Sequence, residues 1–457
     1  MKAITLIITI LFFGLILAGP VLAQERAPEA PVQELQKGEP SAATGPAAAP
    51  KVDAGDTSWV LFSAALVMLM TPGLALFYGG MVRRKNVLGT IMQSFIALAV
   101  ITIQWVLYGY SLSFGPDIGH VIGNLSWIGL NGVGLDPYPD YAATIPHQAF
   151  MIFQMMFAVI TPALITGAIA ERFKFKTYLV FLVLWSTFVY DPMAHWVWGV
   201  GGWIRNLGAL DFAGGLVVHI SSGVAALAAT MMVGRRKGYG GEPMPPHNLT
   251  MTLLGAALLW FGWFGFNGGS AVASGSLATS AFVVTHISTA AAALSWMIAE
   301  WKYRGNPTVL GAASGAVAGL VAITPASGFV GPVSAIIIGL AAGILCYFAI
   351  NLKNKFGYDD SLDVVGVHGV GGTWGAIATG LFASKAVNAA GADGLFYGNF
   401  SLLGVQALSV VSAWVYSFVV TFLILKILDK TMGLRVNEEH EVNGLDLSQH
   451  GESGYSF

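Results

Sequence analysis

The sequence has little charge of either sign. Only 10% of its 457 residues are Asp, Glu, Lys or Arg, whereas charged residues make up about 25% of an average soluble domain. Most of this chain therefore cannot face water, which excludes an ordinary soluble globular fold. The formal net charge is −2, and the basic residues form no continuous stripe. We therefore expect no nucleic-acid partner.

Cysteine is almost absent as well. The only one, Cys346, lies within an apolar run, so an internal disulfide is excluded and we interpret it as a small core side chain. Three of the nine histidines, His147, His195 and His286, lie in or near apolar segments. They have no second ligand at the spacing of a metal or haem site. The sequence thus predicts neither a metal site nor a cofactor.

Long apolar runs are what the sequence does have. Residues 57–82 carry no charge, and this run exceeds the roughly 20 residues that cross a bilayer as a helix. The runs are continuously apolar and lack the alternation typical of β-barrel strands. The sequence therefore predicts an all-α polytopic membrane protein with eleven transmembrane helices. The candidate spans are 57–80, 88–113, 147–170, 177–194, 212–233, 249–267, 276–299, 308–324, 330–351, 363–383 and 402–427.

The first residues are typical of a signal peptide. A lysine precedes an apolar stretch, and small residues at 21–23 form a cleavage site, so we predict a signal peptide over 1–23. An uncleaved first helix is the alternative. Residues 24–55 are rich in Ala, Pro, Glu and Gly, which predicts an exported flexible tail. The transmembrane domain is then expected over 56–430.

Basic residues are concentrated in alternate loops, after the odd-numbered spans. The intervening loops carry only Arg205 and Lys385. By the positive-inside rule, the odd-numbered exits are cytoplasmic, which places the N-terminus outside and the C-terminus inside. This orientation agrees with an exported N-terminal tail. The basic residues after the first, third and fifth spans are Arg83, Arg84, Lys85, Arg172, Lys174, Lys176, Arg235, Arg236 and Lys237.

Two similar segments lie five spans apart. One begins at Asp211 and reaches His219, the other begins at Asp363 and reaches His368, and a glycine follows each histidine by four residues. An odd number of spans per repeat inverts the second copy, an arrangement that places a site near the midplane. We therefore expect an inverted five-helix repeat whose two histidines meet in the middle. Chance similarity between glycine-rich helices is the alternative.

The two histidines are candidate functional residues. A histidine inside a membrane helix is costly without a partner, and an imidazole can donate at one nitrogen and accept at the other. A facing pair of His219 and His368 would form a polar strip along an apolar path and could relay a proton. A packing role is the alternative for each residue taken alone, but their equivalent positions favour a shared function.

Aromatic residues near the predicted outer end form a second candidate site. Phe153 and Phe157 lie one turn apart in the third span, Trp198 follows the fourth, and Phe266 and Ser270 lie at the end of the sixth. Aromatic faces attract small cations, and a serine hydroxyl can accept a hydrogen bond from one. An interfacial aromatic belt is the alternative, and position alone does not separate Trp198 from nearby tryptophans.

Asp211 and Asp363 precede the two histidine helices. Aspartate is a favoured N-cap and complements the helix dipole, so we interpret both residues as caps that support the site. Direct contact with a cation is the alternative.

Residues 211–219 closely resemble the signature of the Amt/Mep/Rh ammonium transporters, and residues 363–370 resemble the second histidine segment of that family. The resemblance extends in order from about residue 57 to the C-terminus. Trp198 favours the bacterial Amt branch over the Rh branch. Further similar segments are 72–87, 108–112, 170–172 and 263–270.

The resemblance implies a role for each candidate residue. The four residues that match an external ammonium recruitment site are Phe153, Phe157, Trp198 and Ser270, and Asp211 matches the aspartate that supports it. Phenyl rings stacked below that site would form a gate, and a hydrophobic pore with twin histidines would follow. The gate residues are Phe157 and Phe266, and the pore residues are His219 and His368.

The resemblance also implies an assembly and a place in the cell. We expect a homotrimer with one pore per subunit in the bacterial inner membrane, surrounded by lipid. The cytoplasmic C-terminal tail, residues 431–457, would communicate with a PII-type signal protein. The chain departs from the family in its N-terminal tail and in a long outer loop at 115–146, and neither is expected at the pore.

The expected function is transport rather than catalysis. Ammonium, or its analogue methylammonium, would lose its proton near the gate and cross as neutral ammonia, because a bare cation in an apolar pore is costly. Potassium has no proton to lose and would be excluded. An ammonium sensor, or transceptor, that reports through the C-terminal tail is the alternative, and a carbon dioxide channel of the Rh type is a third possibility.

Overall fold

The computed structural model describes residues 51–456. The predicted signal peptide (1–23) and most of the predicted tail (24–55) lie outside the described residues. The helices are α2 (Ala54–Met81), α3 (Val87–Gln104), α4 (Tyr110–Phe114), α5 (His147–Ile169), α6 (Phe175–Trp185), α7 (Asp191–Trp198), α8 (Trp203–Asn206), α9 (Ser221–Val233), α10 (Leu249–Gly268), α11 (Ser276–Arg304), α12 (Val309–Ile323), α13 (Pro332–Phe356), α14 (Gly371–Phe382), α15 (Phe400–Thr431) and α16 (Glu438–Asn443).

The predicted all-α membrane fold is confirmed. Nine helical segments in the described part of the chain are long and apolar enough to cross a membrane. The other two predicted spans coincide with shorter elements: α12, which has 15 residues, and the segment 365–382, in which a π-helical turn leads into α14. Most of α12 is buried among other helices, so its length need not match the apolar thickness of a bilayer.

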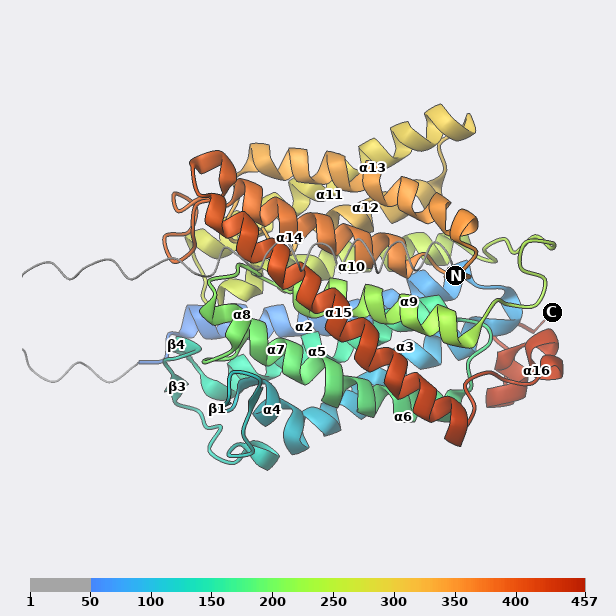
Figure 1. Cartoon of the computed structure of the whole chain (residues 1–457), viewed down its shortest axis with the longest axis horizontal. Helices are drawn as coiled ribbons and strands as arrows, with labels where there is room; N and C mark the ends of the chain where they lie inside the picture. Colours follow the sequence, from blue (N-terminus) through green and yellow to red (C-terminus); the bar gives the residue numbers. More distant parts are fainter. Residues whose placement is uncertain (1–50, 457) are drawn as a thin grey trace, which may run out of the picture. The chain divides into compact units, whose positions relative to one another are not determined.

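The helices run between two ends (Figure 1). One end carries two small antiparallel hairpins of the long loop, β1 (Asp117–Ile118) with β2 (Ile122–Gly123) and β3 (Pro137–Tyr138) with β4 (Ala142–Pro146). The other end carries α16. We call these the outer end and the inner end, after the predicted orientation.

The basic loops gather at the inner end, as the alternation of charge predicts. Lys174 donates to the carbonyl of Met432, and Lys237 forms an ion pair with Glu438. Lys85 also donates to the backbone of the C-terminal segment. The loops after the first, third and fifth spans therefore all contact the segment that follows α15.

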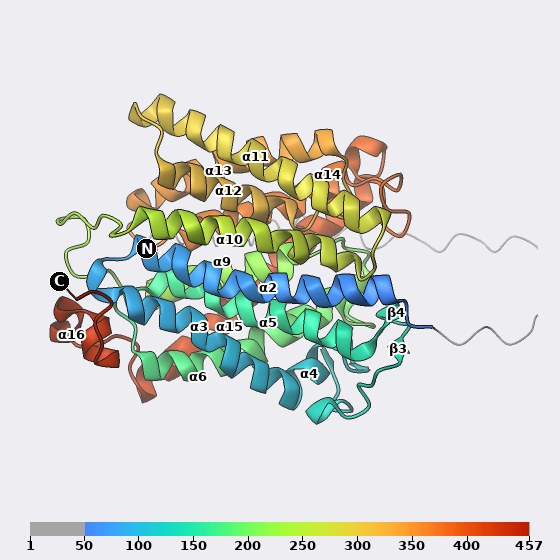
Figure 2. The ribbon, with the colours of Figure 1, turned by 180° about the vertical axis from the view of Figure 1, so that it is seen from behind.

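Small residues allow the longest helices to pack closely. Figure 2 shows α10 lying along α2, and the pair owes its close approach to glycine. A Cβ on Gly255 would lie 2.2 Å from the backbone nitrogen of Phe77, and one on Gly80 would lie 2.5 Å from the carbonyl oxygen of Asn248. Where lipid cannot drive helices together by the hydrophobic effect, such close packing holds them.

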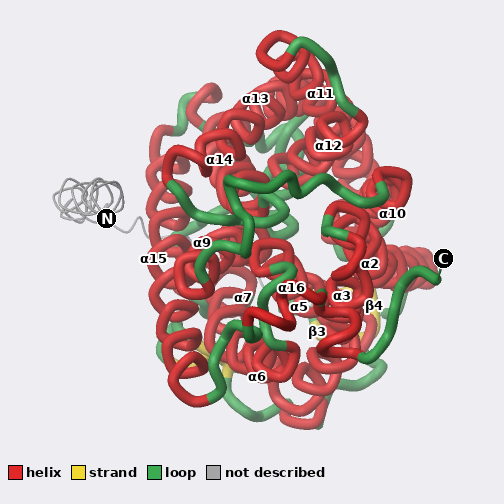
Figure 3. The backbone as a smooth tube through the Cα atoms, turned by 90° about the vertical axis from the view of Figure 1, so that its right-hand side faces the viewer, coloured by secondary structure: helices red, strands yellow, loops and turns green. Residues whose placement is uncertain are grey.

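Viewed end-on, α5 lies toward the middle of the helical array, with α15 along one edge (Figure 3). Most of α5 is buried, whereas α15 exposes apolar side chains such as Leu423 and Ile427. The inner helix α5 carries Phe157 of the candidate site.

Candidate functional site: a narrow passage between two cavities

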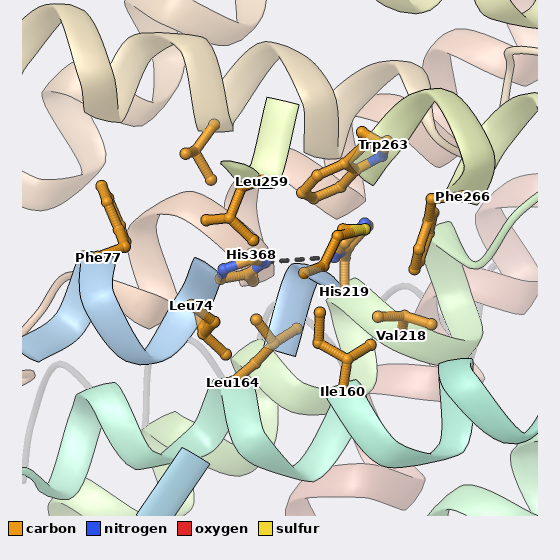
Figure 4. Close-up of a pocket in the computed structure, with 12 residues that line it drawn as sticks. Leu74, Phe77, Ile160, Leu164, Val218, His219, Leu259, Trp263, Phe266 and His368 are labelled. Carbon is orange, nitrogen blue, oxygen red and sulfur yellow. Dashed lines mark hydrogen bonds between the residues drawn. The ribbon is translucent and has the colours of Figure 1, made fainter. Parts of the chain in front are cut away.

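His219 and His368 meet inside the protein. Their Nδ1 atoms are 3.2 Å apart, so one nitrogen donates and the other accepts a hydrogen bond. The ring centroids are 5.3 Å apart with an interplanar angle of 28°, and both residues are buried. Figure 4 shows the two rings joined across the centre of the passage. The structure therefore brings together the two residues that the repeat predicted to meet.

Glycine lets the two histidine segments cross. His219 lies in the π-helical turn Gly215–Ile220 and His368 in the π-helical turn Val365–Val370. A Cβ on Gly223 would lie 2.2 Å from the backbone nitrogen of Gly369. No other residue fits at that crossing, and the glycine that follows the first histidine by four residues is thus explained by backbone contact.

The first turn is capped by Asp211 from the outer end. Its carboxylate accepts hydrogen bonds from the backbone N–H groups of Gly214, Gly215, Leu216 and Val217, at 2.5 to 3.3 Å. Burial raises the pKa of Asp211, while these four donors act in the opposite direction. The predicted capping role is seen directly, and the carboxylate is occupied by the backbone.

The second turn is capped by Asp360, which corrects the role predicted for Asp363. Asp360 accepts a 2.7 Å hydrogen bond from the N–H of Val365, and burial raises its pKa to about 6. Asp363 instead adopts a left-handed backbone conformation, with φ of 64°, and pairs with Lys353. The missed signal was the spacing: Asp360 lies eight residues before His368, as Asp211 lies eight before His219.

A narrow apolar passage, which we call the neck, surrounds the histidine pair. Its volume is only about 10 Å³. Trp263 stacks on His219 with centroids 5.4 Å apart, and Nε2 of His219 has no hydrogen-bond partner among the described residues. The other residues that line the neck are Met70, Leu74, Phe77, Ile160, Leu164, Val218, Leu259, Phe266, Val317 and His368.

A wider cavity, the outer cavity, opens on the side of Asp211. It has a volume of about 290 Å³, and Phe157, Trp198, Asp211 and Ser270 all line it. The indole N–H of Trp198 donates to the carbonyl of Asp211 at 2.9 Å. Trp196, by contrast, donates to the loop carbonyl of Val121. The structure thus distinguishes Trp198 from its neighbour, which position in the sequence did not.

Two phenyl rings separate the outer cavity from the neck. Phe157 lines the outer cavity and Phe266 lines the neck, and their centroids are 4.2 Å apart with an angle of 30°. Phe266 also faces His219, at 6.1 Å between centroids. The two predicted gate residues therefore pack together between the predicted recruitment site and the histidines.

Phe153 does not take the place predicted for it. It is fully buried and packs against Phe157, with centroids 5.0 Å apart, and the part of α5 that faces the cavity carries Phe150, Gln154 and Phe157. With about 100° between successive helical residues, Phe153 falls to one side of that face. Phe153 therefore packs against Phe157 and does not line the outer cavity.

Several cavity residues come from segments that sequence reasoning did not connect to the site. Tyr141 and Asp140 come from the β3–β4 hairpin, and Arg205 comes from α8. No periodicity marks residues in such loops. The one available signal was that Arg205 is one of only two basic residues in the predicted outer loops.

A third cavity, the inner cavity, continues the path beyond His368. Its volume is also about 290 Å³. It shares Phe77, Val317 and His368 with the neck, and Asp363 and Glu300 are among its polar lining residues. The site is therefore a passage in which two wide cavities, one toward each end, meet at an apolar neck with paired imidazoles. Among the described residues, no cluster of three or more His, Cys, Asp or Glu side chains could hold a metal ion.

Membrane-crossing helices around such a passage define an integral membrane protein of the channel and transporter class. A sequence model described as the Ammonium Transporter Family matches residues 58–455. The chain is 57% identical to an ammonium transporter of Bacillus subtilis, over 88% of this chain and 98% of that protein. The chain belongs to the ammonium transporter family.

Solved structures agree with this assignment. The crystal structure of Candida albicans Mep2 superposes with a TM-score of 0.81 at 37% identity, and the match covers 88% of this chain and 91% of that one. The structure of a sensor Amt protein superposes with a TM-score of 0.79 at 31% identity, covering 87% of this chain and 98% of that one.

Proposed function

We propose that this protein carries ammonium across the membrane by recruiting it in the outer cavity, removing its proton near the phenyl pair and conducting ammonia through the neck. The observation that carries the proposal is the hydrogen-bonded pair of His219 and His368 inside an apolar passage. The similarity to ammonium transporters such as that of B. subtilis supports the substrate.

The outer cavity offers the groups that a small cation needs. The rings of Phe157 and Trp198 meet edge to face, at 5.9 Å and 89°, and aromatic faces attract cations. The hydroxyl of Ser270 donates to the carbonyl of Phe266, which leaves its oxygen lone pairs available to an N–H donor. Ammonium therefore finds aromatic faces and an acceptor in one place.

The neck is what selects against cations that cannot lose a proton. Its walls are apolar and its volume admits little more than one small molecule, so a cation would enter without its hydration shell at a cost of several kcal/mol. Ammonia avoids that cost. The free Nε2 of His219 provides one of the few polar contacts along the way.

The assembly and orientation form part of the same proposal. A homotrimer in the bacterial inner membrane would cover some of the apolar side chains that the helices expose, such as Phe95, Ile298 and Leu423. The N-terminus would lie outside. The C-terminal segment would lie in the cytoplasm, where a PII-type signal protein could reach it.

A sensor is the second candidate function. It is favoured by the likeness to a sensor Amt protein, which covers 87% of this chain. In that case ammonium would occupy the same outer cavity, and the C-terminal segment packed on the inner loops would report occupancy.

Purified protein in liposomes tests the proposal. Electrical recording on a solid support, together with radiolabelled methylammonium uptake, should show transport in response to an ammonium gradient and none in response to an equal potassium gradient. Equal responses to both ions would overturn selective conduction through the neck. Ammonium binding without transport would favour the sensor.

A further inference from the structure

Three charged side chains line the outer cavity: Asp140, Arg205 and Asp211. Asp211 is buried, and its two oxygens accept four backbone hydrogen bonds. Its charge is therefore largely stabilised by the N–H groups of the helix turn that carries His219. The charges that remain available to an entering ion are those of Asp140 and Arg205.

Arg205 holds an unusual position for a basic residue in this chain. The predicted outer loops contain only one other, Lys385, which is exposed but does not line the cavity. Arg205 is also exposed, and its Nη1 donates to the carbonyl of Trp198 at 2.5 Å. The positive charge of Arg205 thus lies at the rim of a cavity that is proposed to attract a cation.

Asp140 supplies the opposite charge from the turn between β3 and β4. It is exposed, and among the described residues neither Asp140 nor Arg205 is in an ion pair. Both charges affect the pKa of the Tyr141 hydroxyl. Burial is the largest cause and raises this pKa, Arg205 lowers it, and Asp140 raises it further. The two charges therefore reach the same part of the cavity with opposite sign.

We propose that Asp140 and Arg205 set the affinity of the outer cavity for its cation, with Asp140 tightening binding and Arg205 weakening it. The inference rests on the proposed function and names two determinants of affinity in the recruitment site. A weaker site releases its ligand more readily toward the neck. The pair thus fixes the concentration at which transport saturates, while the passage of ammonia through the neck is untouched.

The size of the effect follows from Coulomb's law. Unit charges roughly 8 Å apart in a solvent-exposed cavity of effective dielectric about 60 change a binding constant by roughly threefold. Salt weakens such an effect, because the screening length falls to about 3 Å at 1 M ionic strength. A purely structural role of Arg205 would not depend on salt in this way.

The test is the Km for radiolabelled methylammonium uptake into proteoliposomes. Arg205→Gln should lower the Km by roughly threefold and Asp140→Asn should raise it by a similar factor. The maximal rate should shift in the same direction as the Km and by no more than about the same factor, because a tighter site releases its ion less readily toward the neck. The double variant should return to the wild-type Km, and all shifts should shrink in 1 M salt.

Matched controls separate position from charge. Lys385→Gln and Asp136→Asn remove exposed charges of the outer loops that do not line the cavity, and they should leave the Km unchanged. Arg205→Lys keeps the charge and should match the wild type.

A raised Km in both Arg205→Gln and Arg205→Lys would overturn the inference in favour of a role in holding Trp198. Unchanged Km values in Arg205→Gln and Asp140→Asn, with a transporting wild type, would also overturn it. A wild type that transports no methylammonium would instead count against the proposed function.

Discussion

Asp211 and Asp360 occupy equivalent places in the two halves of the protein. Each lies eight residues before a histidine of the neck, and each accepts a 2.7 Å hydrogen bond from the N–H of the fifth residue that follows it. Asp211 lines the outer cavity, whereas the segment of Asp360 leads in from the side of the inner cavity. The histidines are thus positioned from opposite ends by the same local device, as an inverted repeat requires.

The cap at Asp211 should be a strong determinant of stability. Asp211→Ala leaves four N–H groups of a buried turn without their acceptor, and we expect a loss of about 2 kcal/mol or more in the free energy of unfolding. Asp211→Asn keeps one acceptor oxygen and should lose less. Thermal unfolding in detergent measures both.

Asp53 provides a matched control for that experiment. It caps α2 through a single bond from the N–H of Asp56 at an exposed site, so Asp53→Ala should cost about 1 kcal/mol or less. A loss as large as that of Asp211→Ala would show that the buried turn has no special importance.

The paired imidazoles should be essential for selective transport. His219→Leu and His368→Leu preserve the apolar character of the neck but remove its polar contacts. A molecule that crosses a buried path without hydrogen-bond partners loses roughly 1–3 kcal/mol per missing contact. We therefore expect methylammonium uptake to fall by at least about tenfold. His286→Leu is the control, because His286 contacts Trp260 and Phe264 away from the neck. Uptake at the wild-type rate in either neck variant would refute the role.

Much of this architecture could be predicted because long apolar runs in a sequence identify membrane helices. The meeting of His219 and His368 could also be predicted, because an odd number of spans fixes the inversion. The rotation of a helix about its axis is harder to predict. The one-turn spacing of Phe153 and Phe157 shows that they share a face, but not whether that face points toward the cavity. Asp140 could not be found, since hairpin residues follow no period. Asp360 could have been found from its spacing to His368.

Asp360 should make stability depend on pH. Burial raises its pKa to about 6, above the ordinary value of about 3.9, so the folded state binds this proton more tightly than the unfolded state. Its ionisation therefore disfavours folding above about pH 6, by roughly 3 kcal/mol. Asp360→Asn keeps an acceptor for Val365 and should be more stable than the wild type at pH 7.5.

The advantage of Asp360→Asn should shrink as the pH falls through 6 and disappear near pH 4. The pKa of Glu171 is shifted in the opposite direction. Although burial alone would raise this pKa, Arg236 and Arg83 hold it below the ordinary value. Its contribution is present above about pH 4.5 and is lost only as the pH falls below that. The difference in thermal unfolding between variant and wild type from pH 5 to 7.5 therefore isolates Asp360, and a difference that does not depend on pH would contradict the assignment.

The C-terminal segment should depend on one buried carboxylate. Glu441 is 1% exposed, pairs with the guanidinium of Arg435 through both oxygens and accepts the N–H of Lys237 at 2.7 Å. Glu441→Ala removes the carboxylate that pairs with the partly buried guanidinium of Arg435 and leaves the N–H of Lys237 without its acceptor. We expect this change to cost about 3 kcal/mol and to release the segment that follows α15. Limited proteolysis should then cut the variant there much faster than the wild type. Glu438→Ala is the control, because that exposed glutamate forms only a surface pair with Lys237, which solvent and salt screen. Equal cleavage rates in the two variants would mean that α16 is held by its other contacts and not by Glu441.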